Sequence, residues 1–412
     1  MKNKILLLIY LTFFFANTVY SQDMRFDSLL NGGKAEFKKD TGNNYALAIS
    51  YLNKAILIKP ENAEAHYFLG YAYSRINSEG GGTIPLMKLP LVIKASEQLQ
   101  TVIKLSPNYQ GEIIVLDPYS KLTSEWGAMA ASYLYHNKTD SAIWALKEGK
   151  KRGGFDDFIL SETRLILESC SKNSIIVVCG DNFFFPFLYL QNVESLRKDI
   201  SMVEVDILSS SWYPDFLTSN SDVQFDIPGM ELDTLDYKQW SDSTVSIPVY
   251  GTSRVFKWVL KPSYENQYIL RQDRLLLSLL MKNKFKYDVY FTKGFVVDEE
   301  LSLTDSLLEF PLVDKLSVHN ERPWDTEQIF EHLKQWSLEL KPANKYSPFE
   351  GYPIDHIRSN VINQASYDID HNQHKEAAKL INALETYLPE KNYPTTMDNF
   401  GKCVDSLKKA AN

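Results

Sequence analysis

The 412-residue chain is poor in the side chains that most often do chemistry, with three cysteines and seven histidines. Cys170, Cys179 and Cys403 cannot build a disulfide framework. Cys179 ends an apolar run and has no histidine nearby in sequence, so we interpret it as a buried thiol rather than a nucleophile. The motifs Gly-x-Ser-x-Gly, His-Glu-x-x-His and Gly-x-Gly-x-x-Gly are absent. We predict no cofactor, and the sequence contains no complete catalytic set.

An excess of basic residues is also lacking. Lysine and arginine number 44 against 52 aspartates and glutamates, which gives a net charge of −8. Proteins that bind nucleic acid usually present a basic face to the phosphates. The composition therefore argues against nucleic acid as a partner.

Long apolar runs are missing after the first 21 residues, so we expect no membrane span in the mature chain. Residues 1–21 have a basic start followed by an apolar core, Ile5–Ala16, that is short for a spanning helix. We predict a signal peptide cut between Ser21 and Gln22, with an uncleaved anchor as the alternative. The mature protein is then periplasmic or secreted.

Residues 22–170 carry a helical repeat with small and large residues at the offsets of the 34-residue tetratricopeptide repeat. The positions that fit are Ala48, Leu52, Ala55 and Pro60, then His66, Leu69, Gly70 and Tyr73, then Ala95, Leu99, Val102 and Pro107, then Trp126, Met129, Ala130 and Tyr133, then Ala142, Leu146 and Gly149. The stretch from Gly70 to Ala95 is longer than the repeat allows and contains three consecutive glycines, so we expect a peripheral, flexible insertion there. Such arrays usually bind another protein.

Residues 171–340 alternate strand and helix patterns, which predicts a three-layer, parallel-sheet, Rossmann-like domain. The predicted strands are Ile175–Cys179, Ile200–Leu208 and Tyr287–Thr292, and a helix is predicted from Pro186 to Arg197. Two further apolar runs, near residues 240–262, are separated by Gly251-Thr-Ser-Arg254 and predict an inserted β-hairpin.

Polar side chains follow the ends of these three strands. Ligands bind at the carboxyl ends of parallel strands, so one cleft is predicted there. Its candidate residues are Asp181, Asn182, Asp206, Ser211 and Thr292. A structural role is the favoured alternative for the first two, as caps that accept backbone N–H bonds at the start of the following helix.

Gly180-Asp-Asn182, Pro186 and Tyr189-Leu-Gln191, followed by Val193-Glu194, Arg197 and Asp199, resemble a motif of a bacterial family. Its larger members are protein O-mannosyltransferase-like membrane proteins with a soluble, repeat-bearing tail, and the likeness covers about residues 170–390. Phe183-Phe184 replaces the family's Asp-Thr, which makes a polar site less favourable. The membrane half that the family's mannosyl transfer implies is absent, so the resemblance does not imply that activity here.

Residues 341–412 contain a proline-rich stretch and then Ala377, Ile381, Leu384 and Pro389 at repeat offsets, so we predict a linker and a short tetratricopeptide-like helical segment. His371 and His374 fall at its polar turn, and we predict no metal site there. The first functional hypothesis is a non-catalytic interaction or scaffold protein of the cell envelope. The second is an enzyme or glycan-binding accessory module that uses the Asp181 cleft and is related to protein glycosylation.

Overall fold

The structure is a computed structural model that describes residues 22–226, 235–293, 301–318, 324–340, 351–395 and 397–411. It is mixed α/β, with 58% of its residues in helices and a mixed sheet of five strands. The chain divides into two compact units, Met1–Gly154 and Phe155–Asn412. The predicted signal peptide lies outside the described residues. No helix in the ranges just given is long and apolar enough to cross a membrane.

The first unit is helical. Its elements are a helix at 22–35, η1 (Glu36–Lys38), α2 (Tyr45–Ile58), α3 (Ala63–Asn77), η2 (Gly81–Leu86), α4 (Leu89–Leu105), α5 (Pro118–Tyr135) and α6 (Thr139–Lys151). The side chains of Asn44, Asn62 and Asp117 each accept backbone N–H bonds at the start of the helix that follows. Such caps fix where a helix begins. From α2 to α6 each long helix packs on the next one in the chain.

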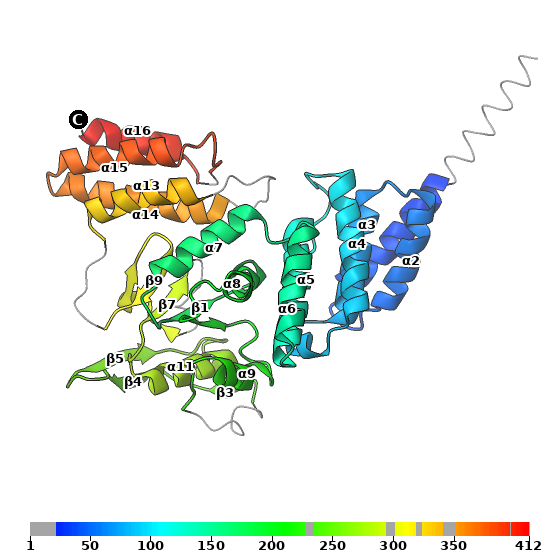
Figure 1. The fold of residues 1–412 in the computed structure, drawn as a ribbon, viewed down its shortest axis with the longest axis horizontal. Coiled ribbons are helices and arrows are strands. Elements are labelled where there is room, and N and C mark those ends of the chain that lie inside the picture. The colour runs from blue at the N-terminus through cyan, green and yellow to red at the C-terminus, as the bar shows by residue number, and fades with distance from the viewer. Residues whose placement is uncertain are drawn as a thin grey trace, which may run out of the picture. The chain divides into compact units, whose positions relative to one another are not determined.

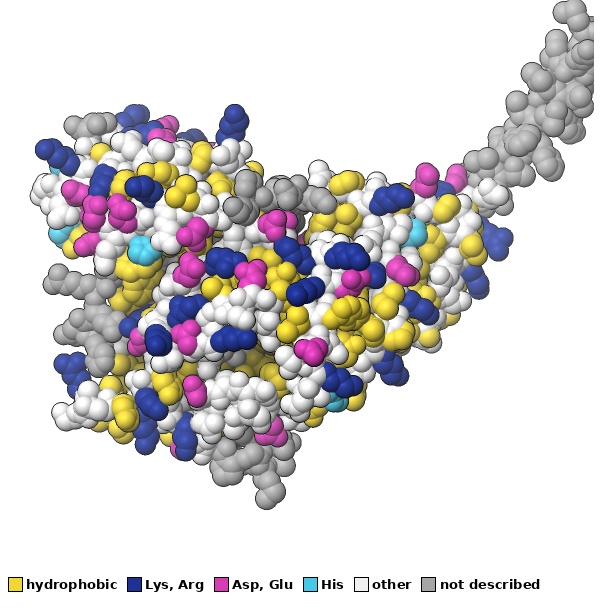
Figure 2. Space-filling view, viewed as in Figure 1, with side chains coloured by type: hydrophobic (Ala, Val, Ile, Leu, Met, Phe, Trp, Pro, Cys, Tyr) yellow, Lys and Arg dark blue, Asp and Glu magenta, His cyan; other side chains and the backbone are white. Residues whose placement is uncertain are grey.

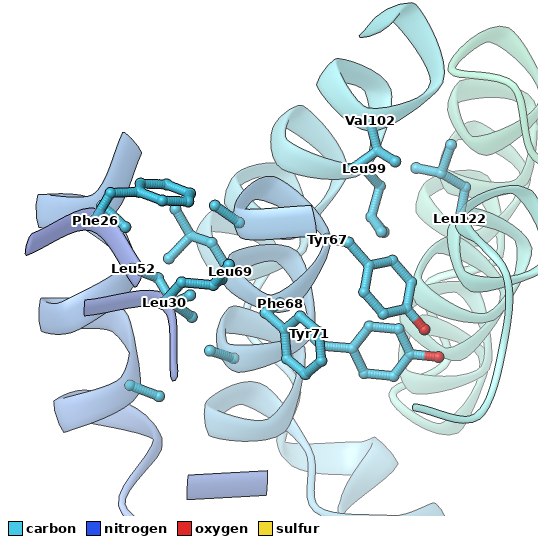
Figure 3. Packing of buried hydrophobic residues seen from close by; sticks show 14 residues of the cluster. Phe26, Leu30, Leu52, Tyr67, Phe68, Leu69, Tyr71, Leu99, Val102 and Leu122 are labelled. Atoms are coloured by element: carbon cyan, nitrogen blue, oxygen red, sulfur yellow. The ribbon is translucent and has the colours of Figure 1, made fainter. Parts of the chain in front are cut away.

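Small residues allow these helices to approach. A methyl group added at Gly70 of α3 would lie 3.1 Å from Leu99 Cγ and 3.3 Å from the carbonyl oxygen of Ala95, so a side chain there would push α4 away. Ala48, Leu52 and Ala55 of α2 follow a 4, 3 spacing on one helix face and are all fully buried. Figure 3 shows the large side chains that fill this core, with Phe26 and Leu52 on one side of α3 and Leu122 on the other.

The glycine-rich insertion is more ordered than the sequence suggests. Residues Gly81–Leu86 form η2, which packs against α5 and buries Ile84. The carbonyl oxygen of Pro85 lies 2.9 Å from Nε2 of His136. Asn77, the last residue of α3, fixes the C-terminal end of the insertion, because its side chain hydrogen-bonds both the N–H and the carbonyl of Lys88. The expectation of a flexible excursion is therefore wrong, since a short apolar run inside the insertion finds a packing partner.

The second unit is built on a sheet with the strand order β2-β1-β7-β9-β8. The strands are β1 (Ile175–Val178), β2 (Ser201–Glu204), β7 (Val289–Thr292), β8 (Leu307–Glu309) and β9 (Val313–Leu316). Strand β1 pairs in parallel with β2 on one side and with β7 on the other. The prediction of three parallel strands is confirmed, but β9 and β8 join in antiparallel fashion, so the sheet is mixed. These two strands were not predicted, because β8 is only three residues long and β9 is interrupted by Asp314 and Lys315.

Helices lie on both sides of this sheet. Figure 1 shows α7 (Asp157–Ser169) and α8 (Asp181–Val193) on one side, and α9 (Tyr213–Asn220) and α11 (Arg271–Asn283) on the other. Helix α8 begins five residues before the predicted start at Pro186, so that proline lies inside the helix and cannot donate to the carbonyl of Asn182. Strand β2 ends four residues earlier than predicted, because the chain turns at 206–209.

The predicted hairpin is present as β4 (Ser243–Pro248) and β5 (Val255–Leu260), which pair antiparallel. A second ribbon, β3 (Tyr237–Gln239) with β6 (Tyr268–Leu270), was not predicted. The indole N–H of Trp258 on β5 donates to the carbonyl of Leu301 at 2.9 Å, which ties the hairpin to the chain that follows β7.

The C-terminal part is helical, with η3 (Thr304–Ser306) preceding β8 and the helices α13 (Thr326–Glu339), α14 (Gly351–Asp370), α15 (His374–Tyr387) and α16 (Phe400–Ala411) following the sheet. Asp325 and Gln328 form a capping box at the start of α13. Arg358 of α14 is fully buried and bonds Asp355 and the carbonyls of Leu388 and Tyr393. Residues 341–350 of the predicted linker at 341–353 lie outside the described residues, and the prediction is wrong for 351–353, where the chain already forms the first turn of α14.

Candidate functional site

The candidate site lies where β1 ends. Gly180 follows β1 in the left-handed region, with φ of +93°, and a methyl group added to it would meet no atom within 4 Å. Glycine enters this region without the strain that other residues carry. It lets the chain leave the buried strand and start α8 at the next residue, Asp181. The apolar strand and the turn thus place Asp181 and Asn182 at the carboxyl edge of the sheet.

Glu204 is the buried acid of this edge. It is the last residue of β2, it pairs in register with Val178 of β1, and it is 3% exposed. Its Oε1 accepts the backbone N–H groups of Gly180 and Asp206, each at 3.1 Å. Within the described part of the chain, its buried Oε2 has no hydrogen-bond partner. Oε1 therefore joins the two loops, whereas Oε2 takes no part in this contact.

The electrostatics of Glu204 follow from its surroundings. Burial raises the pKa of this carboxyl well above its ordinary value, and the nearby carboxylates of Asp206 and Asp181 raise it further. A raised pKa means that the folded protein favours the protonated form of this carboxyl. Glu204 is flanked at the strand ends by two acidic side chains, Asp181 and Asp206.

Two other buried polar atoms lie at the same edge. Thr292 ends β7 on the other side of β1 and is 1% exposed. Its Oγ1, like Oδ1 of Asn182, has no hydrogen-bond partner among the residues that the structure describes. Buried polar atoms in proteins are nearly always bonded, so such a group at one sheet edge calls for an explanation. A polar ligand or water bound at this edge would supply the bonds.

Asp206 and Cys179 form a pair beside this group. The thiol of Cys179 donates to the carboxylate of Asp206, with Sγ 3.6 Å from each oxygen. Cys179 is half-buried, so the prediction of a buried thiol is wrong, because the turn after β1 opens this position to solvent. Asp206 itself is exposed.

The predicted cap role of Asn182 is wrong, because its Oδ1 accepts no hydrogen bond from the residues that the structure describes. The position before α8 is Gly180, which has no side chain, so the helix has no side-chain cap from that position. Asp181 is the first helical residue, where its negative charge faces the positive end of the helix. Ser211 is exposed in the bend before α9, whose N-cap position is Trp212 without a side-chain cap bond.

Sequence reasoning missed Glu204, although the signal was there as an acidic residue between Val203 and Val205 of the predicted strand. The next polar residue after Thr292 is Lys293, which forms an ion pair with Asp314 of β9. The ammonium group of Lys293 therefore neutralises the charge of Asp314 on the neighbouring strand. In the portion of the chain that the structure describes, no group of three or more His, Cys, Asp or Glu side chains is arranged to hold a metal ion.

Residues 161–260 match the family model described as TMEM260-associated domain 2. The matched segment runs from α7 through β5 and so contains Gly180, Glu204 and Asp206. The match fits a TMEM260-like, O-mannosyltransferase-related family. No curated protein matches the chain. Fold and site define a mixed α/β domain with a polar, acidic strand edge. The likeness to this family covers residues 161–260, which include β1 and β2 but not β7, β8 or β9 of the sheet.

Proposed function

We propose that the protein is an exported, non-catalytic interaction protein of the cell envelope, and that its helical unit binds another protein. The observation that carries this is the nearest-neighbour packing of α2 to α6, with fully buried small residues such as Ala48 and Ala142 where helices meet. This is the construction principle of repeat arrays, which offer extended binding surfaces. On this reading the helices are tetratricopeptide-like.

The exposed side chains of the helical unit are consistent with this role. Leu57 of α2 is 85% exposed and Trp144 of α6 is 44% exposed. Figure 2 shows one face of the molecule, on which hydrophobic side chains are interspersed with both basic and acidic ones. A mixed surface of this kind suits a protein partner better than the phosphates of a nucleic acid.

The test is cross-linking of the tagged full-length protein in the intact cell envelope, followed by mass spectrometry. We expect recurrent cross-links from one partner to lysines of the helical unit, such as Lys54, Lys94 and Lys104. Cross-links confined to residues 155–411 would move the interaction to the other unit. Recovery of the protein without any cross-linked partner would contradict the proposal.

A second candidate is a glycan-binding accessory module related to protein glycosylation. It is favoured by the buried, unused polar atoms of Glu204, Thr292 and Asn182 at one sheet edge. Carboxyl, hydroxyl and amide groups are the ones that bind sugar hydroxyls, because each can donate or accept a hydrogen bond. The similarity of this segment to an O-mannosyltransferase-related family supports the same ligand class.

This candidate is tested by titrating the full-length protein with methyl α-mannoside and following chemical shifts by NMR. We expect shifts at residues next to Gly180 that disappear in Glu204→Gln and Thr292→Val. Glu162→Gln is the matched control, because Glu162 of α7 is also a buried acid but does not lie at the strand ends. Equal loss of the shifts in the control, or no shifts in the wild type, would exclude glycan binding at this edge.

A further inference from the structure

A pocket of about 300 Å³ opens between α15 and α16, the last two helices of the second unit. The two helices pack side by side (Figure 1). Leu384 of α15, Leu388 at its C-terminal cap and Val404 of α16 line the pocket with apolar side chains that are 1%, 1% and 4% exposed. The volume is at the lower end for ligand pockets in proteins, so it suits a single side chain better than a large cofactor.

The pocket is held in shape from behind by Arg358 of α14. The guanidinium of this buried arginine lies 5.0 Å from the ring centre of Phe400, which lines the pocket at the start of α16. The same guanidinium donates to the carbonyl of Leu388 at 3.0 Å, and Asp355 balances its charge at 3.0 Å. Because one buried group contacts both sides of the pocket, the pocket is formed before any ligand arrives.

Gly401 leaves the mouth of the pocket open. It is the second residue of α16 and lines the pocket, and a Cβ atom added to it would meet no atom within 4 Å. Glycine weakens a helix relative to alanine, and here neither close packing nor a left-handed backbone requires it. A larger side chain at this position therefore has room to extend over the pocket.

The rim of the pocket is acidic. Glu385, Glu390 and Asp405 are exposed and line it, and none of the described lining residues is basic. Glu385 forms an ion pair with Lys408. In the part of the chain that the structure describes, Glu390 and Asp405 form no ion pair. Two uncompensated carboxylates beside an apolar base favour a ligand that is aliphatic and positively charged at one end.

We propose that this pocket binds a lysine side chain from a basic segment of a partner protein. The methylene groups of the lysine are buried against Leu384, Leu388 and Val404, while its ammonium group stays in water near the acidic rim. Long charged side chains commonly cover apolar surface in this way. The site lies in the other unit from the partner surface proposed above, so either proposal can fail without the other.

The experiment titrates the methyl-labelled full-length protein with the peptide acetyl-Leu-Lys-Leu-Lys-Leu-amide and follows the methyl signals of Leu384, Leu388 and Val404 by NMR. We expect these signals to shift, whereas the same peptide with glutamate in place of lysine leaves them unchanged. Gly401→Leu, which fills the mouth, should weaken binding about tenfold or more. Ser406→Leu is the matched control, because it adds the same side chain at an exposed position of α16 that does not line the pocket, and it should leave binding unchanged.

A second variant tests the charges of the rim. Glu390→Gln combined with Asp405→Asn should weaken binding of the lysine peptide about fivefold and reduce the weakening that added salt causes. Both changes are at exposed side chains, so this variant carries the test if Gly401→Leu does not fold.

The proposal is overturned if the lysine peptide shifts none of the three methyl signals, or if the glutamate peptide shifts them equally. Unchanged affinity in the charge variant also overturns it. Sedimentation of the wild type and of Gly401→Leu tests the remaining occupant. Self-association of the wild type that is lost in Gly401→Leu would assign the pocket to a second copy of the chain, against the proposal.

Discussion

At the residue scale, Glu204 links the site to the stability of the domain. Its pKa is raised in the folded protein, so folding favours the protonated form. The stability that this preference brings is fully present below the unfolded value, near pH 4.5, and is lost as the pH rises through the folded value.

We therefore predict that Glu204→Gln, which keeps the acceptor for Gly180 and Asp206, raises the free energy of unfolding at pH 8 by about 1 kcal/mol or more. At pH 4 the difference from the wild type should be small. Urea unfolding at both pH values measures this. A loss of stability at pH 8 would mean that the ionised carboxylate is the stabilising form.

Arg197, which like Asp199 belongs to the motif that resembles the bacterial family, has a structural role. Its guanidinium donates to the carbonyls of Leu167, Cys170 and Ser171 around the C-terminal end of α7, and it also pairs with both oxygens of Asp199. This pairing is the main reason that the pKa of Asp199 falls to about 2. A planar group with five donors makes all these bonds at once, which an ammonium group cannot.

We predict that Arg197→Lys lowers the free energy of unfolding by about 2–4 kcal/mol. Arg164→Lys is the control, because its pair with Glu194 is more exposed, and it should cost about 1 kcal/mol or less. The stability gained from Asp199 is present above pH 3.8 and is lost as the pH falls toward 2, so the effect of Arg197→Lys should shrink in that window. Equal costs for the two lysine variants would refute this account.

At the scale of elements, η2 decides whether the insertion matters for folding. Ile84 is 5% exposed and Leu86, two residues on, is 71% exposed. Ile84→Ala should lower the free energy of unfolding by about 2 kcal/mol or more, because it leaves a cavity against α5. Leu86→Ala should change it by about 0.5 kcal/mol or less. Thermal unfolding of both variants measures these changes. If η2 were a loose loop, the change in the free energy of unfolding would be small for both variants.

At the scale of the whole molecule, export is the prediction that the sequence makes most directly. We expect the native protein to begin at Gln22 and to be recovered outside the cytoplasm, because a basic start and a short apolar core precede that point. N-terminal sequencing and cell fractionation measure this. Recovery of a chain that starts at Met1 in the cytosolic fraction would contradict it.

The sequence predicted the elements better than their ends. Apolar runs located β1, β2, β7 and the hairpin, because continuous apolar stretches of this length are typical of buried strands. It failed at Pro186 and after Glu204, where a glycine turn and a buried carboxylate, respectively, fix the boundaries. For the site, it named Asp181, Asn182, Asp206, Ser211 and Thr292 from strand ends alone. It missed Glu204, whose role depends on N–H groups from two different loops.

By itself, the sequence determined the local patterns: the apolar strands, the small residues of α2 to α6, the acidic composition and the N-terminal apolar run. Each of these follows from residue type and spacing along the chain. Only the tertiary structure decided that β8 and β9 complete the sheet, that η2 is packed, and that Arg358 contacts both Leu388 and Phe400. These features depend on contacts between residues far apart in the chain, and periodicity carries no information about which distant segments will meet.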